Sequence, residues 1–93
     1  MVNLEVKIRF IEDSIQLDAL AELVPYMRKI HKLPTEGPSV NYRLITVWNF
    51  DGFLDHITVT DHDNHRPTQQ YPDEQYLRIG EERSYTLDDL KRF

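Results

Sequence analysis

Residues 41–60, NYRLITVWNFDGFLDHITVT, decide the fold of this chain. Two runs rich in β-branched and aromatic residues, 41–50 and 53–60, flank the dipeptide Asp51-Gly52. An Asp-Gly pair between two such runs is a strong hairpin signal, because a tight hairpin turn needs positive φ angles that these residues tolerate. The stretch therefore predicts two adjacent antiparallel strands.

Two registers fit this hairpin. A two-residue Asp51-Gly52 turn pairs Phe50 with Phe53, and one face then carries Tyr42, Leu44, Trp48, Phe50, Phe53, Ile57 and Val59. A turn with a bulge at Gly52 pairs Asn49 with Phe53 instead. One face then carries Ile45, Val47, Phe53, Ile57 and Val59, and the other carries Tyr42, Leu44, Trp48 and Leu54. A slip of one residue moves a strand's side chains to the opposite face, so the sequence leaves both registers open.

A strand and a helix are predicted before the hairpin. Residues 2–10 alternate strictly between apolar and polar side chains, which is typical of a strand with one buried face. Residues 14–32 place apolar side chains three and four positions apart, as an amphipathic helix does. Pro25 lacks a backbone N–H and clashes with the preceding turn, so we expect a kink or break near Val24.

The remaining segments predict loops, a short strand and a last helical turn. Residues 33–40 hold two prolines and a glycine, and 61–75 has no aliphatic residue, so we expect a loop at each and a mobile one at 61–75. A short strand is expected at 76–80, and Thr86 is a suitable cap for a final helix. The order β-α-β-β-(β)-α predicts an α+β fold in which a Pro-kinked helix packs on a small, mostly antiparallel sheet.

Length and composition limit the classes of protein. The 93 residues suit a single domain, 1–93, and 40% of them are hydrophobic, as in ordinary folded domains. There is no cysteine, which excludes disulfides and thiolate metal sites. No apolar stretch approaches the ~18 residues that a membrane span needs. The N-terminus alternates instead of forming a signal sequence, so we expect a cytoplasmic protein with no membrane contact.

The charge is unevenly distributed. The net charge is −5, and it lies entirely in 51–93, which holds ten acidic and five basic residues. The basic cluster Arg28, Lys29 and Lys32 stands at a predicted helix end, where the helix dipole explains it. Direct nucleic-acid binding, which needs a basic face, is therefore disfavoured. An acidic surface suits a protein partner with a basic surface. A mimic of nucleic acid is a further alternative.

A group of histidines and aspartates raises the possibility of a metal site. Three of the four histidines lie within 55–65. His62, His65 and Asp61 are the candidate ligands of a metal-binding module or metal-dependent enzyme, with His56 and Asp63 nearby. Against this, a loop does not preset ligand geometry, and Asp and Asn are common in turns. His56 and its neighbour Asp55 are expected to point to opposite faces of their strand.

The sequence contains no recognisable catalytic set or cofactor motif, so we expect a non-enzymatic protein without a cofactor. The aromatic hairpin either packs in the core or, if Trp48 and Tyr42 face away from the helix, forms a protein contact. We therefore expect a protein-binding accessory, inhibitor or regulatory protein, with a homodimer through 2–10 or the aromatic face as one arrangement. The expected interaction surface comprises Tyr42, Trp48, Phe50, Asp61, Asp63, Asp73 and Glu74.

Overall fold

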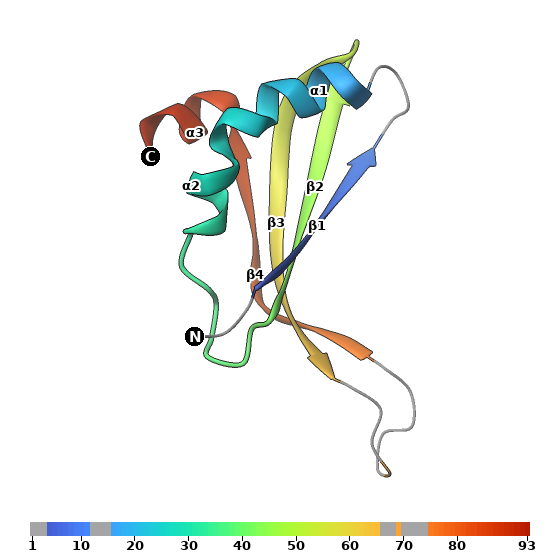
Figure 1. Cartoon of the computed structure of the whole chain (residues 1–93), viewed down its shortest axis with the longest axis vertical. Helices are drawn as coiled ribbons and strands as arrows, with labels where there is room; N and C mark the ends of the chain where they lie inside the picture. Colours follow the sequence, from blue (N-terminus) through green and yellow to red (C-terminus); the bar gives the residue numbers. More distant parts are fainter. Residues whose placement is uncertain (1–3, 12–15, 66–68, 70–74) are drawn as a thin grey trace.

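The fold is a four-stranded mixed sheet with its helices on one face (Figure 1), which confirms the predicted α+β class. The computed structural model describes residues 4–11, 16–65, 69 and 75–93. Its elements are β1 (Glu5–Ile11), α1 (Gln16–Leu23), a 3₁₀ turn (Val24–Tyr26), α2 (Met27–His31), β2 (Tyr42–Phe50), β3 (Phe53–His65), β4 (Gln75–Thr86) and α3 (Leu87–Arg92).

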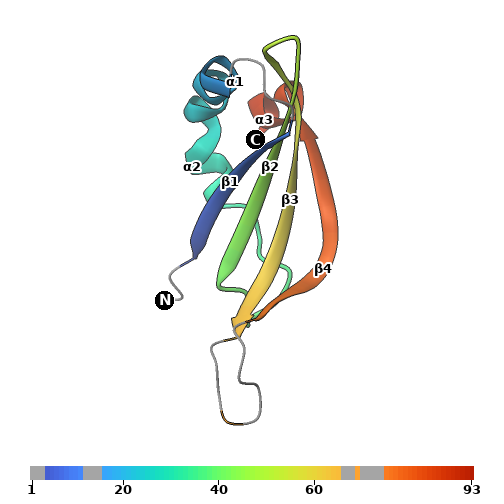
Figure 2. The same cartoon turned by 90° about the vertical axis from the view of Figure 1, so that its right-hand side faces the viewer.

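The strands lie in sequence order, β1-β2-β3-β4, with β1 parallel to β2 and the other pairs antiparallel. Parallel neighbours need a crossover connection, and α1 and α2 belong to it. Figure 2 shows α1, α2 and α3 on the same side of the sheet. No helix among the described residues covers the opposite side, which we call the open face.

Pro25 breaks the helix where the sequence predicts it. The α-helical conformation ends at Leu23, a 3₁₀ turn spans Val24–Tyr26, and helix resumes at Met27. Pro25 occupies the first turn of the 3₁₀ segment, where its missing N–H costs least. The break lets α1 and α2 follow the twisted sheet in different directions (Figure 1).

The hairpin combines features of both predicted registers. Asp51 and Gly52 have φ angles of 51° and 83° and pair Phe50 with Phe53, as the first register requires. Deeper in the sheet, one face carries Ile45, Val47, Ile57 and Val59 together, as in the second register, although the observed pairs, Ile45 with Val59 and Val47 with Ile57, belong to neither. A bulge reconciles the two, because Trp48 pairs with His56 while Asn49 pairs with Leu54, and Asp55 is the extra residue between them.

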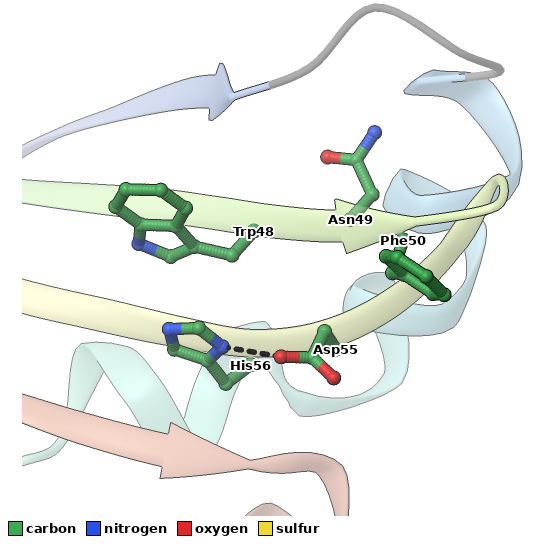
Figure 3. Close-up of a pocket in the computed structure, with 5 residues that line it drawn as sticks. All are labelled: Trp48, Asn49, Phe50, Asp55 and His56. Atoms are coloured by element: carbon green, nitrogen blue, oxygen red, sulfur yellow. Dashed lines mark hydrogen bonds and ion pairs between the residues drawn. The ribbon is translucent and has the colours of Figure 1, made fainter.

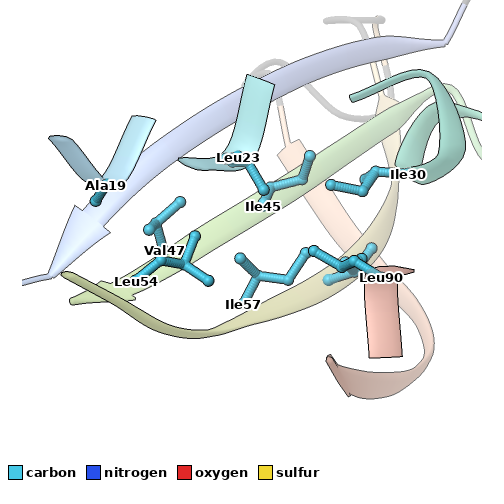
Figure 4. Close-up of a cluster of buried hydrophobic side chains, with 9 residues drawn as sticks. Ala19, Leu23, Ile30, Ile45, Val47, Leu54, Ile57 and Leu90 are labelled. Atoms are coloured by element: carbon cyan, nitrogen blue, oxygen red, sulfur yellow. The ribbon is translucent and has the colours of Figure 1, made fainter. Parts of the chain in front are cut away.

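The hydrophobic core lies between the sheet and the helices (Figure 4). Its fully buried members come from α1, α2, β2, β3 and α3: Ala19, Leu23, Ile30, Ile45, Val47, Ile57, Val59 and Leu90. From β1, alternate residues Val6, Ile8 and Phe10 pack against it, as the period-two pattern of the N-terminal segment predicts. The last helix closes one end through a capping box, in which Thr86 and Asp89 exchange side chain-to-backbone hydrogen bonds.

Both ends of the segment expected to be a polar loop are strand. Residues 61–65 continue β3 and Gln75 opens β4, so the predicted loop at 61–75 is wrong at both ends, and 66–68 and 70–74 lie outside the described residues. The predicted short strand at 76–80 also extends to Thr86. The polar residues of both strands are stable in this conformation because hydrogen bonds of the β3–β4 ladder satisfy their backbone N–H and C=O groups.

A buried ion pair joins the sheet to the crossover connection. Arg43 on β2 and Asp61 on β3 are cross-strand partners, fully buried, with Nε donating to Oδ1 at 2.7 Å. The other guanidinium nitrogens of Arg43 donate to the carbonyl oxygens of Ile30, Leu33 and Pro34. Arg83 from β4 completes the network with a 3.0 Å bond to Asp61 Oδ2. Residues of five segments are thereby held together.

Two opposing effects set the pKa of Asp61. Burial by itself raises the pKa of this carboxyl, but the hydrogen bonds and charge of Arg43, the Glu36 amide and Arg83 outweigh burial. The pKa of Asp61 is consequently lowered from its usual value. Asp61 is therefore charged in the folded protein at neutral pH, and its partners are the groups that keep it so.

Replacing Arg43 by alanine is expected to destabilise the fold strongly. The substitution leaves a buried carboxylate and several carbonyl oxygens without their main donor, a change that costs about 3–5 kcal/mol. Urea unfolding measures the loss, with the exposed Arg78→Ala as the matched control, expected within about 0.5 kcal/mol of wild type. Equal effects of the two substitutions would show that the Arg43 network contributes no net stability.

Stability is expected to fall on acidification, partly through Asp61. Because the folded pKa of Asp61 is lowered, its contribution is present above the unfolded pKa of about 3.9 and is lost as pH falls through the folded pKa. Asp61→Asn should be less stable at pH 7 and show a shallower decline below pH ~4. The exposed Asp88→Asn is the control for charge. An unchanged acid slope in Asp61→Asn would contradict this assignment.

Candidate functional site

The bulge places Asp55 and His56 together on one side of the hairpin. Consecutive strand residues normally point to opposite faces, and the sequence therefore predicts no contact between these two side chains. That prediction is wrong, because Asp55 is the extra residue of the bulge. His56 Nδ1 lies 2.7 Å from Asp55 Oδ2, and the imidazole and carboxylate are 32% and 64% exposed.

Trp48 lies directly across from His56 on β2. Their rings are stacked, with 5.6 Å between centroids and only 6° between the planes. The Trp48 indole N–H donates to Thr58 Oγ1 at 3.3 Å, which fixes the orientation of the indole on the open face. Trp48 and Tyr42 thus face away from the helices, and the cross-strand pair Thr46 and Thr58 lies between them on the open face. Trp48 is therefore not a core residue.

Two phenylalanines extend the aromatic surface to the tip of the hairpin. Phe50 and Phe53 are cross-strand partners beside the turn and are 69% and 67% exposed. Trp48 lies two residues before Phe50 on the same strand. The hairpin end therefore carries three exposed aromatic side chains close together. Neither phenylalanine belongs to the hydrophobic core, so core packing does not explain why these exposed positions are aromatic.

A pocket of about 260 Å³ lies at this end of the sheet (Figure 3). We call it the hairpin pocket, and its lining residues are Trp48, Asn49, Phe50, Asp55 and His56. In Figure 3 the Asp55 carboxylate lies between the Phe50 ring and the His56 ring, while Trp48 lies beside His56. The pocket therefore offers flat ring surfaces next to a carboxylate with one oxygen, Oδ2, bonded to His56.

Tyr42 lies at the other end of β2, apart from the hairpin pocket. It is 9% exposed, and its ring contacts His62 edge-on at 5.7 Å and Tyr76 at 4.8 Å. Burial, with Tyr76 and Glu5 nearby, raises the pKa of Tyr42. Of the aromatic residues predicted for the interaction surface, the structure brings Trp48 and Phe50 together and leaves Tyr42 outside the pocket.

The acidic residues predicted for the surface do not gather there. Asp61 is fully buried in the Arg43 network, so it cannot meet a partner directly. Asp63 lies on β3 opposite Leu77 and is partly buried. Asp73 and Glu74 lie outside the described residues. The acid that does adjoin the aromatic surface is Asp55, which sequence reasoning did not select.

The candidate metal ligands are not assembled within the described residues. Asp61 faces the helix side of the sheet, whereas His62 faces the open side and bonds Thr60 Oγ1 through Nε2 at 2.9 Å. Burial lowers the pKa of His62, and Arg78 adds to this against the opposing effect of Asp61. The side chain of His65 is outside the described set. No cluster of three potential ligands occurs in the part of the chain that the structure describes.

The Asp55–His56 pair resembles in chemistry the orienting half of a nucleophile–His–acid triad, in which the carboxylate fixes the histidine tautomer. A nucleophile would complete such a set, but the residues lining the hairpin pocket include no serine, threonine or cysteine. The nearby Thr58 hydroxyl already accepts the Trp48 indole N–H. The pocket offers aromatic ring faces beside a carboxylate.

Comparison with family models, curated proteins and solved structures finds no match to this chain. Within the described residues, no helix has the length and apolar character needed to cross a membrane. The function must therefore be inferred from the residues of the site.

The hydrogen bond to Asp55 is expected to fix the tautomer of His56. A carboxylate accepts only, so neutral His56 must carry its proton on Nδ1, leaving Nε2 without one. Imidazole ¹⁵N chemical shifts of the neutral ring should report this tautomer in the wild type and a mixture in Asp55→Ala. Asp51→Asn, which removes a charge from the exposed turn and tolerates its positive φ, is the matched control. Identical shifts in all three proteins would show that the pair does not form in solution.

Proposed function

We propose that this protein is a non-enzymatic protein-binding module, an accessory, inhibitor or regulator, whose hairpin end contacts the partner. The supporting observation is the cross-strand pair Phe50 and Phe53, about two-thirds exposed, next to Trp48, which is 37% exposed. Burying aromatic side chains of this size is a main source of binding energy in protein interfaces. A tight turn and a four-stranded sheet hold them in place before binding, which reduces the entropy lost on association.

The charge around these aromatic residues favours a basic partner. Asp51 lies in the turn and is exposed, and Asp55 lies beside Phe50 with a 64% exposed side chain. Neither the turn nor the hairpin pocket contains lysine or arginine. Acidic groups at the rim of an apolar contact steer and select a partner of opposite charge. The proposal of a basic partner surface therefore rests on Asp51 and Asp55, instead of on the acidic C-terminal half as a whole.

Self-association is the other arrangement that the fold permits. β1 is an edge strand, so its outer backbone groups have no strand partner within the described sheet. Its outward side chains Glu5, Lys7 and Arg9 are charged and exposed, which opposes edge-to-edge pairing. We therefore propose that the hairpin end contacts a different protein, and we treat a homodimer as one outcome of the experiment.

Site-specific photo-cross-linking in cells tests the proposal. A photoreactive phenylalanine analogue at Phe53 should give a discrete adduct with another protein, whereas the same analogue at Leu17, 78% exposed on α1, should not. The adduct identifies the partner. Phe50→Ser combined with Phe53→Ser should then weaken the affinity for that purified partner by about thirtyfold or more, as removal of interface hot spots does.

A matched pair of variants separates binding from folding. The double phenylalanine variant should lose about 1 kcal/mol of stability at most, because the pair is exposed. Leu17→Ser combined with Val24→Ser removes similarly exposed apolar groups elsewhere and should leave affinity unchanged. Adducts at Phe53 that contain only a second copy of this chain, or partner affinity unaffected by the phenylalanine substitutions, would refute the proposal.

A further inference from the structure

The hairpin pocket has a chemical character more specific than an apolar contact surface. Its carboxylate, Asp55, stands among the rings of Trp48, Phe50 and His56 (Figure 3). A carboxylate beside aromatic faces repels anions and attracts cations, because the negative potential of the ring faces adds to the formal charge. The pocket is therefore selective for a positively charged group.

The shape of the pocket favours a planar cation. The Trp48 and His56 rings lie within 6° of parallel, and the indole is fixed by its bond to Thr58. A guanidinium is flat, stacks on aromatic faces and donates to carboxylate oxygens from a rigid fork, whereas an ammonium is compact and more strongly hydrated. Asp55 uses Oδ2 for His56, and a carboxylate oxygen can accept more than one donor.

The size of the pocket favours one side chain over a free ligand. Its volume, about 260 Å³, is below the range of about 300–1,000 Å³ that is usual for small-molecule sites. Phe50 and Phe53 continue the exposed surface beyond the pocket, so a guest presented by a larger molecule would gain further contacts that a free guanidinium compound would not.

We infer that the hairpin pocket receives an arginine side chain of the protein partner, with the guanidinium stacked on the aromatic rings and paired with Asp55. The inference rests on the proposed function, because it names the group that the partner presents to the same site. His56 acts here as a positioning residue, since its Nδ1–H holds the Asp55 carboxylate beside the rings.

The single tryptophan of the chain makes the test direct. Trp48 lines the pocket, so its fluorescence reports on occupancy without interference from any other indole. Three capped tripeptides are titrated, Gly-Arg-Gly, Gly-Lys-Gly and Gly-citrulline-Gly. Citrulline keeps the planar shape of arginine but has no charge. We expect saturable binding of the arginine peptide, about tenfold tighter than the citrulline peptide, with lysine weaker than arginine.

Variants locate the binding in the pocket. Asp55→Asn, which preserves shape, should weaken the arginine peptide about tenfold and abolish its advantage over citrulline. Asp51→Asn removes an equal charge from the neighbouring turn and should preserve that advantage. Equal binding of the arginine and citrulline peptides, absence of saturable binding, or equal effects of the two substitutions would overturn the inference.

The outcome is separable from that of the proposed function. If the arginine peptide does not bind, but the cross-linked partner still loses affinity when Phe50 and Phe53 are replaced, the arginine inference fails and the protein-binding proposal stands. If the peptide binds and the partner's affinity depends on Asp55, both stand. Substituting the partner's arginines at the cross-linked site by lysine should then weaken the complex, and an unchanged affinity would overturn the inference for that partner.

Discussion

The buried pair of Arg43 and Asp61 is the interaction on which the arrangement of the sheet and the helices depends. A helix end leaves backbone carbonyl oxygens without intrahelical partners, and such groups are costly when buried. Arg43 donates to the carbonyl oxygen of Ile30 in the last turn of α2 and to that of Leu33 just beyond the helix, while its charge is balanced by Asp61. The pair therefore does more than attract two strands, because it joins the end of the crossover helix to the centre of the sheet.

The open face and its hairpin end follow from this topology. A parallel pair of neighbouring strands needs one crossover, and in this chain that crossover places α1 and α2 on the same side of the sheet as α3 (Figure 2). The hydrophobic core then uses only one face of β2 and β3. Trp48 and Phe50, at alternate positions on the opposite face of β2, are left outside the core and exposed.

Local patterns made much of the fold predictable. The alternation in 2–10, the break at Pro25, the Asp-Gly turn and the Thr86 cap each depend on neighbouring residues, and the structure confirms β1, the broken helix, the hairpin and α3. The continuation of β3 through 61–65 and the extension of β4 beyond 76–80 were missed, because the polar residues there are held by the β3–β4 ladder, which leaves no local sequence pattern. Their stability comes from contacts between segments distant in the sequence.

The hairpin pocket was only partly predictable for a related reason. The turn favours pairing of Phe50 with Phe53, while the apolar pattern favours Ile45, Val47, Ile57 and Val59 on one face, and one regular ladder cannot satisfy both. That conflict is itself the signal of a bulge, although it does not say which residue is extra. Placing the extra residue at Asp55 is what brings a carboxylate beside His56 and Trp48.

At the hairpin end, surface residues and core residues lie on opposite faces of the same two strands. The exposed residues there contribute nothing to the hydrophobic core, whereas Val47, Leu54 and Ile57 beside them do. Substitutions at Phe50, Phe53 or Asp55 therefore change the surface chemistry of the hairpin end without re-optimising the interior. The interior and this surface can thus diverge separately, and the same strand positions suit the grafting of a new surface sequence onto an unchanged fold.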